Sequence, residues 1–409
     1  MQNKTLGLPQ GILIGLGSLI GSGIVFLPEK IDAVAGRSSV FVWLGATAIC
    51  LAFVPLFRAL ISEVDLSSGL AAILKDGPLR SVRFSVAYLV LGTVVFGMPI
   101  SAILIAEVFV KAAALSPMIE WALAPSLICV GFFSARSSGC LNKMVIIMAI
   151  SFISLAVIVF ALTTAKAAVN YPEILYHFPD SGTLGGIVFA FWAFSGFENL
   201  LFMSDKFRDP VRDIPKAMFW ALLIASVVYM SIQLNFSALK VFHLNKDALL
   251  PTTGLLFLAS NQNAIEFLPA IVGALSVAAL LFNFVSWYSG ISSLIAHAIN
   301  DGELIVFGNT RVANISLVLM QVAITLACIR YRFLIDTLLK QVSVNFIFIY
   351  ILLTLTFIER IYKRFSLTNV IGATIGILLI GLVVAQPWYA IYPVVLFFVL
   401  HPATKRELP

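Results

Sequence analysis

Two glycine-containing motifs interrupt long apolar stretches of this sequence. The first is Gly21–Ser22–Gly23, near the middle of an apolar run over 9–34. Glycines on both sides of a serine weaken a helix at that point. A helix that stops and restarts there leaves backbone N–H groups free at the start of its second half, and these groups together with the helix dipole bind anions. The motif therefore predicts a backbone site for a carboxylate.

The second motif is Ser195–Gly196–Phe197–Glu198, inside the apolar run over 183–204. A helix break there frees backbone carbonyl oxygens, which suit an ammonium group. The carbonyls concerned belong to Trp192, Ala193 and Phe194. The two motifs together predict a zwitterion held at both ends mainly by backbone atoms. Close helix packing through small residues is the alternative for glycine pairs such as Gly11 with Gly15 or Gly182 with Gly186.

The elements that must position these motifs are membrane helices. Apolar residues make up 60% of the 409 residues, charged residues 11%, and the mean hydropathy is +1.03. A soluble domain carries about a quarter charged residues. Apolar runs of about 20 residues recur, each long enough to cross a bilayer, and spanning segments of this length are helical because lipid cannot pair with free backbone groups. The shorter alternating segments of a β-barrel are absent from the sequence.

We predict an all-α polytopic membrane protein with about twelve spans and no soluble domain. The first run lacks the features of a cleaved signal peptide, so we expect it to be a retained span. The predicted limits are 9–34, 39–62, 82–110, 117–135, 141–165, 183–204, 215–238, 265–297, 312–329, 333–357, 368–385 and 388–402. Lys and Arg favour one set of loops by roughly two to one, which predicts both termini in the cytoplasm although Arg330–Lys340 falls on the other side.

The two motifs fall in the first and sixth predicted spans. Breaks at corresponding positions of two halves mark the binding site of many secondary transporters. The halves would be 1–166 and 183–358, inverted relative to each other because each has five spans, with two trailing helices over 368–402. All of them form a single membrane domain.

Other classes of function lack support in the sequence. The net charge of +6 comes from basic residues in short connections between apolar runs, which indicates membrane topology and not nucleic-acid binding. Neither a clustered His/Cys pattern nor a nucleophile–base motif is present, so we expect neither an enzyme nor a metal site. A channel or a membrane-embedded sensor is the alternative from a different class, although the sequence has no repeated filter motif.

Residues around both motifs resemble the amino acid–polyamine–organocation (APC) superfamily of transporters. Three segments carry the resemblance: Gly7–Leu8 with Gly21–Ser22–Gly23–Ile24–Val25 and Leu27–Pro28; Phe191–Trp192–Ala193–Phe194–Ser195–Gly196–Phe197–Glu198; and Asp209–Pro210–Val211–Arg212–Asp213–Ile214–Pro215. Within the superfamily the chain looks most like the bacterial exporters of methionine and branched-chain amino acids. The resemblance implies a LeuT-like fold of two inverted five-helix repeats, alternating access, no cofactor, and substrate between spans 1, 3, 6, 8 and 10.

The resemblance also assigns substrate contacts to particular positions. It places the carboxylate at the first motif, the ammonium group at Ala193 and Ser195, and aromatic contacts at Trp192 and Trp287. Met98 in the third span and Asn345 in the tenth are further pocket candidates. The full set of expected contacts is Gly21, Ser22, Gly23, Ile24, Met98, Trp192, Ala193, Phe194, Ser195, Trp287 and Asn345. A lysine within the fifth span couples ions in some relatives; here Met148 occupies the deeper position, so that mechanism is unsupported.

Two ionisable residues lie within predicted spans. Glu198 follows the second motif at membrane depth, where a carboxylate must face protein or a cavity. It is either a gate or coupling residue or a cap of the helix that follows. Glu107 sits four residues before Lys111, which predicts a stabilising ion pair.

The scarcity of other buried charges favours neutral apolar amino acids as substrates, by export or exchange. A cationic amino acid or polyamine antiporter is the alternative, because Glu198 could pair with a cationic substrate. A proton or a sodium ion is the candidate coupling ion, and Ser289, Ser292 and Ser293 are candidate sodium contacts. The other expected partner is the lipid bilayer of the inner membrane, and the chain is expected to be a monomer or a homodimer. The basic segment Lys206–Lys216 is interpreted as a topology signal and gate contact, with binding of anionic lipid as the alternative.

Overall fold

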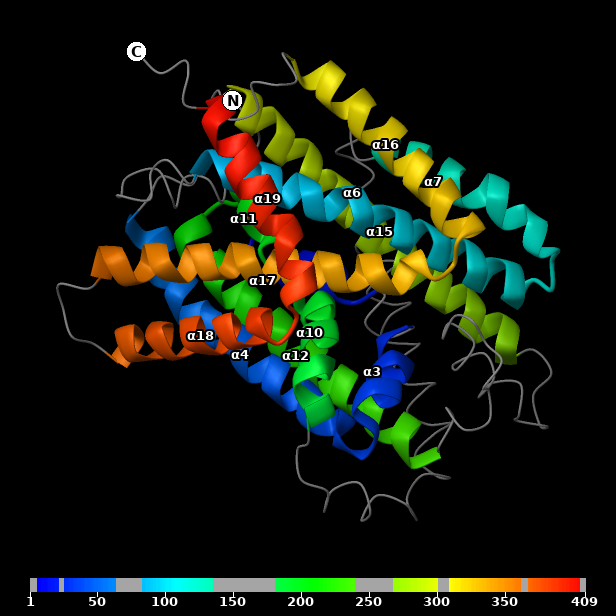
Figure 1. The fold of residues 1–409 in the computed structure, drawn as a ribbon, viewed down its shortest axis with the longest axis horizontal. Coiled ribbons are helices and arrows are strands. Elements are labelled where there is room, and N and C mark those ends of the chain that lie inside the picture. The colour runs from blue at the N-terminus through cyan, green and yellow to red at the C-terminus, as the bar shows by residue number, and fades with distance from the viewer. Residues whose placement is uncertain are drawn as a thin grey trace.

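The computed structural model describes residues 6–21, 26–63, 83–134, 181–239, 268–300, 309–361 and 367–404. Helices form nearly all of this part of the chain, and the one pairing of extended backbone there is an isolated bridge between Leu6 and Phe207. The helices pack as a bundle of crossing rods (Figure 1). Their bounds are α1 Leu8–Leu19, α3 Leu27–Ala35, α4 Ser39–Glu63, α6 Arg83–Ala112, α7 Glu120–Ser134, α10 Ser181–Phe194, α11 Asn199–Phe202, α12 Pro210–Leu239, α15 Leu268–Asn300, α16 Thr310–Arg330, α17 Leu334–Ile361, α18 Leu367–Val384 and α19 Pro387–Thr404.

These helices match the predicted spans closely wherever the chain is described. The predicted fifth span, 141–165, lies outside the described residues. Within the described part, seven helices are long and apolar enough to cross a membrane, or up to eight if the bent pair α18–α19 is one span. The all-helical polytopic prediction is therefore confirmed. The total of twelve spans, the inverted repeats and the LeuT-like fold stay predictions.

The first predicted span is divided into two short helices. Helix α1 ends at Leu19, and α3 begins only at Leu27. A 12-residue helix such as α1 is about 18 Å long, which is short of the roughly 30 Å hydrocarbon core. Neither piece can therefore cross a bilayer by itself. Ser22, Gly23 and Ile24 lie outside the described residues.

The second motif also interrupts a helix. Helix α10 ends at Phe194, a turn covers 195–198, and the short helix α11 begins at Asn199. Gly196 in this turn has φ +134°, a backbone conformation that side chains with a Cβ rarely adopt. The glycine is therefore required by the geometry of the turn.

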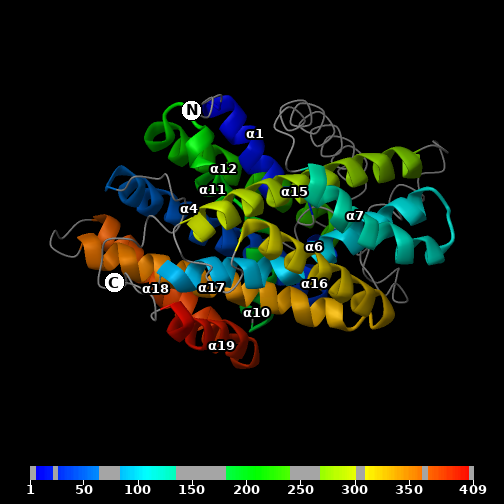
Figure 2. The ribbon, with the colours of Figure 1, turned by 90° about the horizontal axis from the view of Figure 1, so that it is seen from above.

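The broken helices lie at the centre of the bundle. Helix α1 packs on α12 and α15, and α10 packs on α3, α4 and α17. Helix α6 contacts α15, α16 and α17 and lies between them (Figure 2). The bridge at Leu6 and Phe207 ties the chain before α1 to the segment after α11, with Leu6 N–H donating to Lys206 O at 3.0 Å.

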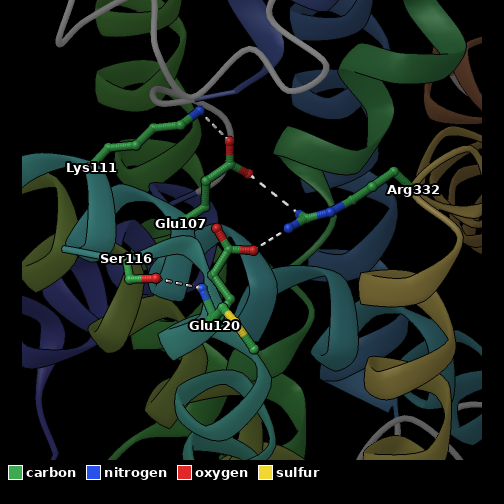
Figure 3. Close-up of polar contacts among 6 residues, drawn as sticks. Glu107, Lys111, Ser116, Glu120 and Arg332 are labelled. Atoms are coloured by element: carbon green, nitrogen blue, oxygen red, sulfur yellow. Dashed lines mark hydrogen bonds and ion pairs between the residues drawn. The ribbon is translucent and has the colours of Figure 1, made fainter. Parts of the chain in front are cut away.

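An ion network fastens the ends of α6 and α7 to the turn before α17. Lys111 pairs with Glu107 one helical turn earlier, which confirms the predicted pair. Arg332 pairs with Glu120 and approaches Glu107, with 3.8 Å between Nη1 and Oε2 (Figure 3). A second pair, Lys30 with Asp336 at 2.7 Å, joins α3 to the first turn of α17. Both sets hold α17 against helices that are distant in sequence.

Candidate functional site

A small cavity lies between the two helix breaks and three long helices. Its volume is about 30 Å³. Its walls come from α1, α6, α10, α15 and α17, which occupy the positions of predicted spans 1, 3, 6, 8 and 10. The lining residues are Ser18, Leu19, Thr93, Val94, Gly97, Met98, Ser101, Trp192, Ser195, Asn283, Trp287, Val342 and Phe346.

Four of the predicted contact residues meet at this cavity. Met98 comes from α6, Trp192 and Ser195 from the end of α10, and Trp287 from α15. The Trp287 ring packs against Phe346 of α17, with 5.8 Å between ring centroids. Aromatic and aliphatic side chains therefore provide much of the wall, and none of the described lining residues is ionisable.

Two of the three backbone carbonyls expected to hold an ammonium group, those of Trp192 and Ala193, already accept hydrogen bonds. The buried Tyr229 hydroxyl of α12 shares its one proton between Leu19 O at 2.7 Å and Ala193 O at 3.2 Å. Trp192 O accepts from the Ser195 hydroxyl at 2.7 Å. In this conformation a substrate ammonium would have to share or displace these donors. Phe194 is not among the described lining residues, and its ring packs against Tyr229 with centroids 5.4 Å apart.

Asn283 of α15 satisfies the last carbonyls of α1. Its Nδ2 donates to Gly17 O at 3.1 Å and to Ser18 O at 2.6 Å. A helix end leaves such carbonyls without partners, so a buried end needs this kind of donor. A Cβ at Gly21 would lie 2.6 Å from the Asn283 Cβ. Gly21 therefore leaves the space that the Asn283 side chain occupies. It is not among the residues that line the cavity.

Asn199, the first residue of α11, joins both breaks to α15. Its Nδ2 donates to the Ser18 hydroxyl at 3.0 Å and to Ser286 O at 3.1 Å, and the two serine hydroxyls lie 2.9 Å apart. Asn199 is fully buried, and a Cβ on Gly290 would lie 1.6 Å from its Oδ1. The neutral amide therefore holds α1, α11 and α15 together at one point.

We predict that Asn199→Asp lowers thermal stability more than Asn199→Ala. Alanine removes one buried donor, at a cost of about 1–3 kcal/mol, and leaves the two serines bonded to each other. Aspartate puts a carboxylate, which accepts but cannot donate when ionised, among oxygen atoms. Thermal unfolding in detergent measures both. Ser126→Ala, which removes an exposed intrahelical bond on α7, is the control and should change little. Equal stability of the two Asn199 variants would contradict the network.

Glu198 lies beside the cavity, not in its wall. Its Oε2 accepts from Gly196 N at 2.9 Å and from the Tyr350 hydroxyl at 2.5 Å, and the residue is only 3% exposed. It occupies the N-cap position of α11, but its side chain makes no cap bond with that helix. The expectation of a side chain that caps α11 is therefore wrong, because the carboxylate turns back into the break.

Aromatic rings enclose this carboxylate. Tyr350 stacks on Phe197 with ring centroids 5.6 Å apart and contacts Phe53 at 4.7 Å. Helices α4, α10 and α17 and the turn after α10 supply these rings, of which the sequence analysis did not single out Phe53, Phe57 and Tyr350. The site thus couples the backbone of the second break to α17 through one titratable group.

Asn345 also lies behind the wall. Its Nδ2 donates to Leu89 O at 2.7 Å and to the Thr93 hydroxyl at 2.6 Å. Thr93 lines the cavity, so the contact of Asn345 with it is indirect. Sequence reasoning missed Thr93, Ser18 and Tyr229, whose only signal was a polar group on an apolar helix.

The chain is similar in sequence to several amino acid transporters and permeases. The chain is 24% identical over 425 aligned residues to the L-methionine/branched-chain amino acid exporter YjeH of Escherichia coli, which covers 99% of this chain and 97% of that protein. Two proteins of Bacillus subtilis match about half of their own lengths. The uncharacterized amino acid permease YecA is 25% identical over 56% of this chain and 53% of its own, and the aspartate-proton symporter is 21% identical over 57% and 47%.

The amino acid permease family matches residues 6–405, nearly the whole chain. Its members are membrane transporters of amino acids and not enzymes. The match covers both helix breaks, the helices around the cavity and the two trailing helices. This chain therefore belongs to the amino acid permease family.

Proposed function

We propose that the protein is a secondary active transporter of neutral apolar amino acids that works by alternating access, by export or exchange. The observation that carries the proposal is the cavity wall, in which none of the described residues is ionisable while Trp192, Trp287, Phe346 and Val342 offer apolar contacts. Such a wall stabilises an apolar side chain and leaves a charged one without a partner.

The size of the cavity supports alternating access. A cavity needs about 10–15 Å³ to hold one water molecule. The cavity volume of about 30 Å³ therefore has room for about two waters and not for an amino acid. Substrate entry therefore requires the walls to move. The helix breaks are the sites at which half-helices can tilt separately, since α1 ends at Leu19 and α10 ends at Phe194.

The zwitterionic backbone of the substrate would bind at the two breaks. The carboxylate is assigned to Ser22 and Gly23 of the first motif, and the ammonium group to the carbonyls near Ala193 and Ser195 after displacement of the Tyr229 hydroxyl. Glu198 is the proposed proton-coupling residue, and the aspartate-proton symporter among the relatives supports coupling to a proton. The proposed location is the cytoplasmic membrane with both termini inside, as a monomer or homodimer.

A cationic substrate is less well supported. Its side chain needs a carboxylate at the cavity, and the nearest candidate, Glu198, is already held by Tyr350 and Gly196 outside the wall. A channel or a sensor does not account for a small apolar cavity between two broken helices. These three alternatives each give a different outcome in a counterflow measurement.

Counterflow in proteoliposomes tests the proposal. Vesicles preloaded with unlabelled leucine should accumulate labelled leucine and methionine saturably, and should not accumulate arginine. A sensor gives no uptake and a channel gives non-saturating flux. Arginine counterflow equal to that of leucine would support the cationic alternative.

Trp287→Ala should raise the half-saturating concentration for leucine by at least about tenfold. Loss of a large buried aromatic contact costs on the order of 3 kcal/mol or more in folded cores, and half of that is already tenfold. The matched control is Trp388→Ala on α19, since Trp388 is 80% exposed and away from the cavity. Equal effects of the two variants would contradict the assignment of the cavity.

A further inference from the structure

A second, larger hollow lies at the ends of α4 and α12. Its volume is about 970 Å³. The two helices lie side by side (Figures 1 and 2), and α4 ends where α12 begins, since Trp43 near the start of α4 bonds Gln233 near the end of α12. The described lining residues are Val54, Pro55, Arg58, Ala59, Ser62, Asp209, Val211, Arg212, Pro215, Lys216, Phe219 and Trp220. We call this hollow the α4–α12 groove.

Three cations face the α4–α12 groove. Arg58 comes from α4, and Arg212 and Lys216 come from one face of α12, four residues apart. All three are exposed, and none has an ion pair with a carboxylate in the described part of the chain. The one carboxylate in the described lining, Asp209, accepts from Arg212 N at 3.2 Å. The groove therefore carries a net excess of positive charge.

Apolar side chains continue from the cations along α12. Phe219 and Trp220 are 40% and 46% exposed and pack edge to face. Ile224 and Val227, four and seven residues after Trp220, extend the same exposed stripe. A tryptophan at the boundary between charged and apolar surface is typical of the membrane interface. The groove thus offers charge for a head group next to a surface for a hydrocarbon chain.

We propose that the α4–α12 groove binds an anionic phospholipid of the bilayer. Arginine guanidinium groups hold phosphate oxygens in a bidentate manner, and Lys216 adds a third positive charge. The acyl chain would lie along Trp220, Ile224 and Val227. The predicted topology places this end of α12 at the cytoplasmic leaflet, where anionic lipids create a negative surface potential.

A lipid bound in the α4–α12 groove would contact a helix that is connected to the transport site. Helix α12 begins three residues after Phe207, whose bridge to Leu6 ties the start of α1 to the segment behind α11. The same helix carries Tyr229, which bonds the carbonyls at both breaks. A lipid that binds the first turns of α12 therefore restricts the movement of the helix that connects the two breaks.

Native mass spectrometry of the full-length protein, delipidated in detergent, tests the proposal. The probes are phosphatidylglycerol and phosphatidylcholine with identical acyl chains. Each cation near a lipid of net negative charge contributes about fivefold in affinity, and phosphatidylcholine has no net charge, so three cations give about 100-fold preference for phosphatidylglycerol. The Arg58→Gln/Arg212→Gln/Lys216→Gln triple variant should lose this preference. Arg212→Gln alone should lose about fivefold.

Arg311→Gln is the matched control for Arg212→Gln. Arg311 is an exposed arginine in the first turn of α16, which does not line the groove. Its replacement should leave the preference unchanged. Equal loss in both single variants, or equal binding of the two lipids by the unaltered protein, would overturn the proposal. If inorganic phosphate displaces phosphatidylglycerol at equal concentration, the groove is a site for a free anion. That result would also overturn the proposal of a phospholipid site. Retained folding of the triple variant is checked by its thermal unfolding.

Discussion

Gly196→Ala is expected to abolish amino acid exchange. Gly196 has φ +134°, and a Cβ there would lie 2.5 Å from Ser18 O, the carbonyl at the end of α1. A non-glycine residue in such backbone costs about 1–3 kcal/mol before the clash is counted. The two breaks must then separate, which displaces Ser18 and Ser195 from the cavity wall. Counterflow of labelled leucine should fall by at least about tenfold.

Gly185→Ala is the control for this variant. Gly185 lies in α10, the helix that precedes the turn with Gly196, and a Cβ there meets only Val34 at 3.5 Å, an ordinary contact distance. Alanine also favours helix formation over glycine. Exchange should therefore persist in Gly185→Ala. Full exchange by Gly196→Ala, in protein whose membrane level equals that of the control, would show that close approach of the two breaks is not needed for transport.

Glu198→Gln is expected to separate exchange from proton-driven accumulation. A glutamine carbonyl can accept the same two hydrogen bonds, from Gly196 N and the Tyr350 hydroxyl, but it cannot take up a proton. Counterflow without a pH gradient should remain. Accumulation driven by a pH gradient should fall to the level seen with no gradient. The measurement is uptake of labelled leucine with and without an imposed gradient.

Tyr350→Phe is the companion variant. It removes the hydroxyl donor but leaves the carboxyl group able to titrate. It should keep the response to the gradient and shift the pH at which transport is half-maximal. If Glu198→Gln keeps gradient-driven accumulation, Glu198 is a structural link between α10 and α17 and another group couples the proton.

The sequence by itself determined which segments are helices and where two of them break. Composition and run length are local properties, and lipid leaves few alternatives to a helix for an apolar run of about 20 residues. The end of α10 at Phe194 follows from Ser195–Gly196, because glycine weakens a helix wherever it is placed. The ion pair between Glu107 and Lys111 could also be predicted from the sequence, since residues four apart lie about one helical turn from each other.

Only the tertiary structure decided which polar groups meet. Tyr229, Asn283 and Tyr350 lie on apolar helices far along the chain from the breaks they contact; Tyr350 is 152 residues from Glu198 and Asn283 is 265 from Ser18. Asn345 lies behind Thr93 for the same reason. Which side of a helix faces its neighbour depends on how the helix is rotated in the bundle. A helix that is apolar on every side carries no stripe that records this rotation.

The position of each helix break and the groups that bind at it therefore depend on different properties of the chain. Their positions follow from Gly21 and Gly196, which local backbone physics makes weak points. What the breaks hold follows from α12 and α15, which bring a hydroxyl and an amide to the exposed carbonyls. Buried backbone groups must be paired, but only packing selects the partner that pairs them.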